Sequence, residues 1–348
     1  MSVLRARRRW RGVLALLSVP PLFLVVSGAW FSLLGSGEPA ARPPRPAGQD
    51  ALWLGHAWVD GRNGEPELAA LAAHLRGGGI GEVYLHTGPL AYDGTLAPSL
   101  YPRAAWAVGA LHRAVPGLRV HAWLGQRVEP GELDLGSPSV RANVVKAAGQ
   151  VLAAGFDGIH YNFEPVPDGD PGLLELLDRT RAAIAPAHGV LSMSVHHIEP
   201  ASGVALVGNA LLGSTKWWTP GYLTQVASRV DQVAVMSYDT AQPTEDAYAG
   251  YVRRQTELAL AAVPPATRLL MGLPAYHDDN LTHHASAETV AAAVRGVRLG
   301  LGMNTRPGFG VALYVDFAAT PADWTSYHRA WEAPSASIPW TSGRAAGP

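Results

Sequence analysis

Residues 156–165 read FDGIHYNFEP, an apolar segment interrupted by polar side chains at alternate positions. This alternation predicts a β-strand, because successive side chains of a strand point to opposite faces. Three polar side chains share one face of that strand: His160, Asn162 and Glu164. The alanine-rich segments on either side, 139–153 and 173–185, have the spacing of amphipathic helices. A strand enclosed by two helices predicts a parallel β/α unit.

The same unit recurs along the chain. Eight β-type segments are predicted as strands, at 52–59, 82–87, 119–124, 158–164, 191–197, 232–238, 269–274 and 310–316. Helical patterns lie between them, at 65–76, 104–114, 139–153, 173–185, 222–228, 248–262 and 288–299. This alternation predicts a (β/α)8 TIM barrel, in which function resides at the carboxyl ends of the strands. An open doubly wound sheet is the alternative, but no G-x-G-x-x-G follows the first strand and no Walker loop is present.

Composition excludes several classes of protein. The chain has 348 residues, 48% of them hydrophobic, which is not the composition of a disordered protein. It has no cysteine, so disulfide scaffolds, thiolate metal sites and lipid attachment through cysteine are excluded. The formal net charge is −1, whereas a nucleic-acid-binding domain is clearly basic. We therefore expect no nucleic acid partner.

Basic charge is concentrated at the N-terminus. Residues 1–11 contain five arginines and no acidic residue, and residues 12–34 contain no charge. The uncharged segment is long enough to span a bilayer core of roughly 30 Å, and the preceding arginines predict that residue 1 lies inside the cell. We expect a single-pass cell-membrane protein with its folded part on the extracytoplasmic side. The alternative is a signal peptide cut near Ser27-Gly28-Ala29, which would release a secreted protein.

These observations predict five parts of the chain. They are a basic cytoplasmic leader (1–11), a signal anchor or transmembrane helix (12–34), a proline-rich linker (35–50), the barrel (51–334) and a C-terminal tail (335–348). The linker is expected to be extended, because it contains four prolines and few apolar residues.

Glu164 is the strongest candidate for a catalytic group. It ends the fourth predicted strand, where partial burial would raise the pKa of its carboxyl and suit it to act as a general acid. The alternative is a carboxylate that pairs with a cation at the strand end for structural reasons.

Four segments together resemble the glycoside hydrolases of family 18, the chitinase-like barrels. That family has D-G-x-D-x-D-x-E on its fourth strand, and this chain has DGIHYNFE at 157–164. Residues 236–239, MSYD, resemble the family's M-x-Y-D, and residues 272–276, GLPAY, resemble its G-L-P-x-Y. Residues 310–314, GVALY, resemble G-x-x-x-W with tyrosine in place of tryptophan.

Departures from the family pattern affect the central positions. His160 and Asn162 stand where the family has aspartates, and the third strand lacks the family's S-x-G-G. The resemblance implies that Glu164 protonates the glycosidic oxygen, while the substrate's own N-acetyl group attacks the sugar carbon. It further implies that Asn162 orients this acetamide and that Tyr238 donates its hydroxyl to the acetamide oxygen. Asp239 would contact the substrate, tune Glu164 or act as a direct nucleophile.

Further residues are predicted to bind substrate. Asp157 matches the family motif, and His160 either orients Asn162 or is an ordinary core histidine. Aromatic rings near strand ends are candidate platforms for sugar faces, or else packing residues: Trp58, Trp123, Trp217, Trp218, Tyr276 and Tyr314. The resemblance thus implies a polysaccharide or other glycan substrate and no cofactor.

Two other functions stay open. The replaced aspartates and tryptophan are compatible with a non-catalytic carbohydrate-binding barrel. Thirteen histidines, several near strand ends, raise the possibility of a metal-dependent hydrolase. No H-x-H or H-E-x-x-H spacing is present, so no metal is predicted.

Overall fold

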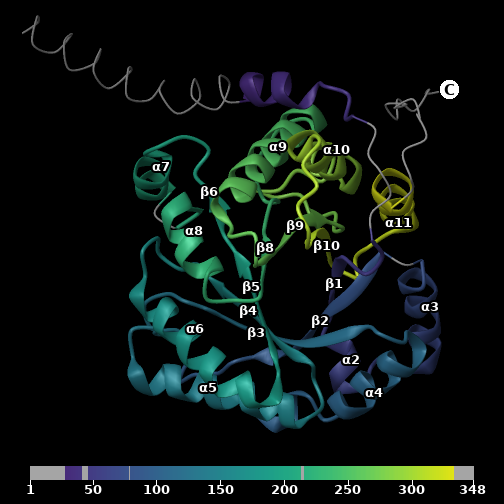
Figure 1. The fold of residues 1–348 in the computed structure, drawn as a ribbon, viewed down its shortest axis with the longest axis vertical. Coiled ribbons are helices and arrows are strands. Elements are labelled where there is room, and N and C mark those ends of the chain that lie inside the picture. The colour runs from purple at the N-terminus through teal and green to yellow at the C-terminus, as the bar shows by residue number, and fades with distance from the viewer. Residues whose placement is uncertain (1–27, 41–45, 78, 213–214, 333–348) are drawn as a thin grey trace, which may run out of the picture.

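The computed structural model describes residues 28–40, 46–77, 79–212 and 215–332. Eight parallel strands close into one barrel (Figure 1), in the order β1-β2-β3-β4-β5-β8-β9-β10 and back to β1. The strands are β1 (Asp50–Leu54), β2 (Ile80–Pro89), β3 (Arg119–Arg127), β4 (Gly158–Glu164), β5 (Val190–Val195), β8 (Gln232–Val235), β9 (Arg268–Pro274) and β10 (Phe309–Tyr314). The predicted (β/α)8 barrel is confirmed.

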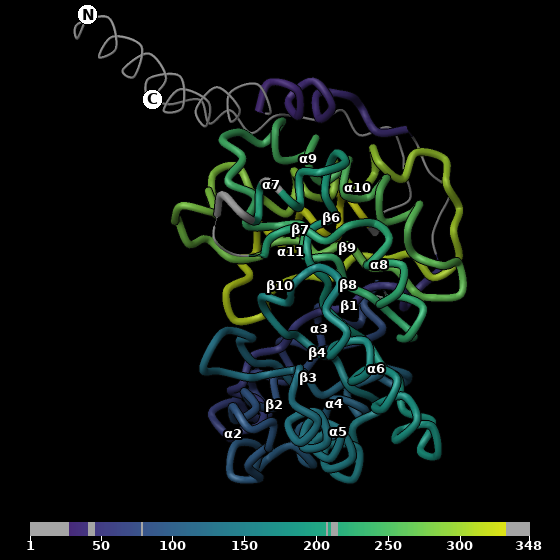
Figure 2. The backbone as a smooth tube through the Cα atoms, turned by 90° about the vertical axis from the view of Figure 1, so that its left-hand side faces the viewer, coloured from purple at the N-terminus to yellow at the C-terminus, as the bar shows by residue number. Residues whose placement is uncertain are grey.

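Helices cover the outside of the barrel (Figure 2). They are α2 (Ala57–Asp60), α3 (Glu65–Leu75), α4 (Ala104–Ala114), α5 (Pro138–Ala153), α6 (Pro171–Ile184), α7 (Val204–Leu212), α8 (Pro220–Ala227), α9 (Glu245–Ala262), α10 (Val290–Leu301) and α11 (Pro321–Tyr327). Short 3-10 turns occur at Pro98–Leu100 and Ala185–Ala187, and a π-helical turn at His328–Glu332. Many of the helices begin where a hydroxyl or carboxylate accepts a hydrogen bond from a backbone N–H of the first turn: Ser137, Asp170, Thr219, Thr244, Thr289 and Thr320.

Several predicted boundaries are wrong. The strand predicted at 52–59 ends at Leu54, and α2 begins at Ala57, because His56 already has helical backbone angles. The helix predicted from residue 288 begins at Val290, because Thr289 is its N-cap. Between β5 and β8 the chain makes an unpredicted excursion through α7 and a two-stranded sheet of β6 (His197–Ile198) and β7 (Trp217–Trp218).

Asp50 joins the two ends of the barrel sequence. It opens β1, is buried, and accepts a hydrogen bond from the backbone N–H of Val311 on β10 at 2.9 Å. Its other carboxylate oxygen accepts from the Tyr327 hydroxyl and the Trp331 indole N–H, both at 2.9 Å. Three donors satisfy this buried carboxylate, which offsets the cost of removing it from water.

A second buried carboxylate lies at the amino ends of the strands. Glu82 on β2 is fully buried and forms ion pairs with Arg119 and Arg268, and His121 lies 3.4 Å away. Burial by itself raises the pKa of Glu82, but the His121 hydrogen bond and the charges of His121, Arg268 and Arg119 lower it to about 2. The ionised carboxylate thus holds β2, β3 and β9 together.

Residues 28–35 form a helix that packs on α9. Figures 1 and 2 show it lying beside α9. Phe31 packs edge-on against Tyr251 at 5.1 Å between ring centroids. The backbones approach so closely that a Cβ on Gly250 would lie 1.8 Å from the Phe31 carbonyl oxygen, and one on Gly35 would lie 2.0 Å from the Asp246 carbonyl oxygen.

This packing changes the predicted organisation near the N-terminus. The end of the predicted anchor (12–34) and the first residue of the predicted linker (35–50) belong to a helix docked on the barrel. Residues 1–27 and 333–348, which include the predicted leader, most of the anchor and the tail, lie outside the described residues. None of the helices in the described part of the chain has the length and apolar character needed to span a bilayer.

Candidate active site

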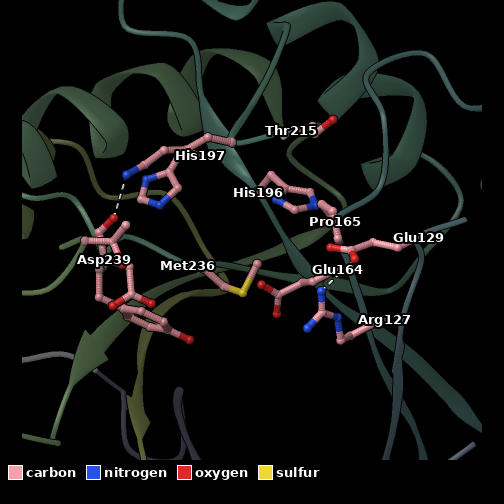
Figure 3. Close-up of a pocket in the computed structure, with 12 residues that line it drawn as sticks. Arg127, Glu129, Glu164, Pro165, His196, His197, Thr215, Met236 and Asp239 are labelled. Carbon is pink, nitrogen blue, oxygen red and sulfur yellow. Dashed lines mark hydrogen bonds and ion pairs between the residues drawn. The ribbon is translucent and has the colours of Figure 1, made fainter. Parts of the chain in front are cut away.

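A cavity of about 400 Å³ opens at the carboxyl ends of β3, β4, β5 and β8. Figure 3 shows Glu164 and Met236 in its centre, Arg127 and Glu129 on one side and Asp239 on the other. Its lining residues are Arg127, Glu129, Glu164, Pro165, His196, His197, Thr215, Lys216, Met236, Tyr238, Asp239 and Thr282. The three residues predicted as acid, hydroxyl donor and second carboxylate therefore share one cavity.

Glu164 ends β4 and is partly buried. Burial raises the pKa of its carboxyl, a hydrogen bond from Asn162 lowers it, and the charge of Asp239 raises it, with a net increase. The neighbouring Arg127 on β3 pairs with Glu129 at 2.6 Å and Glu132 at 3.3 Å rather than with Glu164. With no cationic partner for Glu164 among the described residues, the carboxyl is suited to hold a proton and donate it.

Tyr238 and Asp239 follow β8 in irregular backbone. Tyr238 is buried, and burial, followed by the influence of neighbouring tyrosines and carboxylates, raises the pKa of its hydroxyl well above its usual value. The hydroxyl therefore stays protonated and is a hydrogen-bond donor. Its ring lies against Gly272 of β9, where a Cβ would be 2.9 Å from the ring. Because Gly272, the glycine of the GLPAY segment, has no side chain, it leaves room for the Tyr238 ring.

Aromatic side chains form a wall beside Tyr238. Tyr314, which stands in place of the family's tryptophan, stacks on Tyr238 with ring centroids 5.4 Å apart. Tyr276 is perpendicular to Tyr238 at 5.9 Å, and Trp123 is 6.0 Å from Tyr314. These three rings are partly exposed and pack beside Tyr238, but they are not among the residues that line the cavity, so their role as sugar platforms stays a prediction.

The other predicted aromatic platforms are placed differently. Trp58 is buried and donates its indole N–H to Asp316 at 2.8 Å. Trp218 is fully buried and donates to the Val166 carbonyl oxygen at 2.8 Å. Both predictions are wrong, because a buried ring has no free face for a sugar. Trp217 is partly exposed but lies outside the lining of the cavity, with its indole N–H bonded to the Tyr251 hydroxyl at 3.1 Å.

His160 and Asp157 are also outside the site. His160 is fully buried inside the barrel, stacks on Tyr84 at 3.7 Å and bonds Ser192, Ser194 and Trp53. It is therefore the core histidine of the two alternatives, and its substrate-binding prediction is wrong. Asp157 precedes β4, seven residues and thus roughly 20 Å from Glu164. It accepts hydrogen bonds from the Val120 backbone and His112, so its role is structural.

Sequence reasoning missed a polar cluster behind Asp239. The Asp239 carboxylate accepts a hydrogen bond from the Tyr276 hydroxyl at 2.7 Å and faces His283 at 3.2 Å. His283 also faces the buried Glu288 at 3.3 Å, and the Lys216 ammonium donates to the Asp239 carbonyl oxygen at 2.6 Å. These residues lie in loops, where no periodic pattern reveals their position.

The cluster contains the one group of metal-ligand type found among the described residues. Oxygen or nitrogen atoms of Asp239, His283 and Glu288 lie within 4.8 Å of one another. Lys216 is already close to both carboxylates, and its charge interacts with each of them. The prediction that the protein uses no metal stays a prediction.

Comparisons with solved structures agree with the fold. The chain is similar to the chitinase from Chromobacterium violaceum ATCC 12472, with 16% identity, a TM-score of 0.56 and coverage of 84% of this chain and 99% of that one. A class V chitinase from Pseudomonas fluorescens Pf-5 has the same identity and TM-score, 16% and 0.56, covering 82% and 99%. The spore cortex-lytic enzyme SleL from Bacillus megaterium QM B1551 has 13% identity, a TM-score of 0.56 and coverage of 81% and 74%.

At these identities the similarity establishes the fold. The chain has the barrel that chitinases and a spore cortex-lytic enzyme share, as the resemblance to family 18 implies. No protein-family model and no curated protein sequence matches the chain.

Proposed function

We propose that the protein is a glycoside hydrolase of the family 18 type that cleaves glycans containing N-acetylhexosamine. The observation that carries this proposal is the position of Glu164. It stands at the carboxyl end of β4, its carboxyl pKa is raised by burial, and it shares a cavity with the Tyr238 hydroxyl and the Asp239 carboxylate. The names of the proteins with the same fold, two chitinases and a cortex-lytic enzyme, support the substrate class.

Glu164 acts as the general acid in the proposed reaction. Its proton passes to the glycosidic oxygen as the bond from this oxygen to the sugar carbon breaks. The carbonyl oxygen of the substrate's own acetamide attacks that carbon, as in the substrate-assisted exceptions to the two-carboxylate scheme. Water then opens the resulting ring, and Glu164, now ionised, accepts a proton from this water.

Asn162 and Tyr238 are proposed to position the acetamide. Asn162 hydrogen-bonds Glu164 but is not among the residues that line the cavity, and its side-chain oxygen is buried without a hydrogen-bond partner in the described part of the chain. That oxygen is an acceptor suited to an acetamide N–H, whereas the Tyr238 hydroxyl is a donor suited to the acetamide oxygen. An amide gives no full negative charge to the cationic intermediate, so we expect slower turnover than with an aspartate at this position.

The extracytoplasmic location is also part of the proposal. Its support is the sequence alone: five arginines in residues 1–11 and an uncharged segment at 12–34. We propose a membrane-attached protein whose barrel meets glycans outside the cytoplasm. Protease treatment of intact cells that make the full chain would degrade the barrel if this location is correct and would spare it otherwise.

The enzymatic proposal is tested by comparing Glu164→Gln with Glu129→Gln. Both substitutions remove a carboxylate that lines the cavity, but Glu129 forms an ion pair with Arg127. We expect hydrolysis of N-acetylglucosamine oligomers or peptidoglycan by the full chain, a loss of 100-fold or more in Glu164→Gln, and a small change in Glu129→Gln. Equal turnover in the wild type and Glu164→Gln would show that Glu164 is not the general acid.

The second candidate is a carbohydrate-binding barrel without catalysis. Asn162 in place of an aspartate is the observation that favours it. In that case the wild type binds N-acetylglucosamine oligomers without cleaving them, and Glu164→Gln binds equally well. Isothermal titration combined with product analysis separates the two candidates.

A further inference from the structure

The Asp239 carboxylate faces a histidine with no exposure to solvent. His283 is fully buried, and its Nδ1 lies 3.2 Å from the Asp239 carboxylate and 3.3 Å from the Glu288 carboxylate. Its ring stacks on Tyr276, with centroids 4.2 Å apart. Tyr276 in turn donates its hydroxyl to Asp239. The imidazole therefore has carboxylates at one edge and an aromatic ring on one face.

Backbone contacts hold His283 in this position. The side chain of Asn280 accepts hydrogen bonds from the backbone N–H groups of Thr282 and His283 at 2.8 and 3.0 Å. The Thr282 carbonyl oxygen then accepts from the N–H of Ala241 at 2.7 Å, which ties this loop to the loop after β8. Asp239 is in the left-handed region with φ of +58°, a conformation that costs a non-glycine residue energy and needs such support.

Glu288 completes the support from the opposite side. One of its carboxylate oxygens accepts hydrogen bonds from the Thr240 backbone N–H at 2.8 Å and the Thr240 hydroxyl at 2.9 Å. Its other oxygen is the one that faces His283. Glu288 therefore holds the residue after Asp239 directly, and the imidazole lies between the Glu288 and Asp239 carboxylates.

We propose that His283 is a positioning residue of the active site, whose imidazolium bridges the Asp239 and Glu288 carboxylates and holds Asp239 beside Tyr238. This inference deepens the proposed function and rests on it for the role of Asp239. Glu288 is buried and Asp239 is partly exposed, and two carboxylates this close repel each other unless a positive charge lies between them. Burial by itself lowers the pKa of His283, but Asp239 and Glu288 raise it to about 9, so the charge is present at neutral pH.

Charge accounting favours a proton over a metal ion at this position. The two carboxylates carry two negative charges, and Lys216, which donates to the Asp239 carbonyl oxygen, carries one positive charge. A protonated His283 makes the cluster neutral, whereas a divalent cation with neutral His283 leaves an excess positive charge. The tyrosines that face the cluster are uncharged: Tyr238, Tyr248, Tyr251, Tyr276 and Tyr314. Glu164 also interacts with Asp239, and the raised pKa of its carboxyl favours the uncharged form.

The inference predicts a specific effect on Glu164. The Asp239 charge raises the pKa of the Glu164 carboxyl. Without the positive charge of His283, the negative charge of Asp239 acts more strongly on Glu164 and raises the pKa of its carboxyl further. The basic limb of the pH–rate profile, where activity falls as Glu164 ionises, therefore moves to higher pH. A purely structural role of His283 would lower activity without moving this limb.

The experiment compares His283→Gln and Glu288→Gln with the control His284→Gln in the full chain. His284 lies in the same loop, and its ring contacts the Gln242 carbonyl oxygen at 3.1 Å, outside the cluster. We expect His283→Gln to lower kcat at least tenfold with a smaller change in KM, and to move the basic limb to higher pH. Circular dichroism shows whether each variant is folded. Glu288→Gln removes a negative charge instead of the His283 charge, so it should not move the basic limb to higher pH. If His283→Gln does not fold, the spectroscopic measurement on the wild type decides the proposal.

Two measurements that need no substrate decide whether the bridge exists. Nuclear magnetic resonance of isotope-labelled histidine should show His283 as an imidazolium at pH 7, with the signal absent from His283→Gln. A neutral His283 at pH 7 would overturn the proposal, as would one equivalent of zinc in the purified wild type that is lost from His283→Gln. These results stand whether or not the protein cleaves a glycan, so failure of the bridge and failure of the proposed hydrolase are distinguishable.

Discussion

The substitution Asn162→Asp restores the acidic group that the family 18 pattern has at this position. Asn162 hydrogen-bonds Glu164, so the new carboxylate would lie directly beside the acid. A charge at about 4 Å interacts with another by about 1 kcal/mol in water and about 4 kcal/mol at an effective dielectric constant of 20. Both side chains are partly exposed, which favours the lower part of this range.

This energy translates into a measurable change in pH dependence. One pKa unit corresponds to about 1.4 kcal/mol, so we expect the pKa of the Glu164 carboxyl to rise by about one unit. Glu164 is active while protonated, and activity is lost as pH rises through its pKa. The basic limb of kcat/KM should therefore move up by about one unit in Asn162→Asp. A full negative charge near the acetamide should also increase the maximal rate.

The assay is hydrolysis of a fluorogenic N-acetylglucosamine oligomer from pH 4 to pH 9. Gln225→Glu is the control, because it adds the same charge on the exposed side of α8, outside the cavity. A basic limb that stays in place in Asn162→Asp, or moves to lower pH, would show that position 162 does not act on Glu164 as the structure indicates.

Four further predictions concern the site and the fold. Tyr238→Phe should lower kcat about 100-fold at unchanged melting temperature, because it removes one hydroxyl donor; a normal rate would contradict the acetamide contact. Gly250→Val should lower the free energy of unfolding by about 1–3 kcal/mol in urea, because its side chain meets the Phe31 carbonyl. Gly149→Ala, in open space on α5, should instead raise it by about 0.5–1 kcal/mol. The stabilisation due to Glu82 should be complete above pH 4.5 and decline as pH falls towards its folded pKa of about 2, and urea titrations of Glu82→Gln should lack this decline.

The strands and helices of the barrel could be predicted from the sequence more reliably than the residues at which they begin and end. The bounds of β4 and α4 agree with the predicted ranges, because each is delimited by residues that interrupt the pattern. The first strand was extended too far, since 52–59 is apolar apart from Gly55 and His56 and a change of direction within it leaves no periodic signal. The docking of residues 28–35 on α9 was missed for the same reason, because apolar sequence suits a protein surface as well as a bilayer.

The same limit applies to the candidate site, where some residues could be predicted from the sequence and others could not. Alternation on β4 showed that His160 and Glu164 share a face, but it gave no depth, and His160 lies about 13 Å further into the barrel. Glu164 could be predicted from its place at a strand end, whereas Tyr238 and Asp239 were predicted from the resemblance of MSYD at 236–239 to the family's M-x-Y-D. His283 and Glu288 could not, since their position depends on two loops packing together, and that contact appears only in three dimensions.

The contacts of Asp50 imply that the barrel can close only after the ribosome has made almost the whole domain. This carboxylate opens the first strand, yet its partners on Val311, Tyr327 and Trp331 lie 261 to 281 positions later. A ribosome releases residues in order, so β1 has no neighbour on its β10 side until almost the entire domain has been made. Closing so long a loop is entropically costly and slow. A nascent chain cut short before β10 would retain a sheet with two open edges, a form that a quality-control protease can recognise.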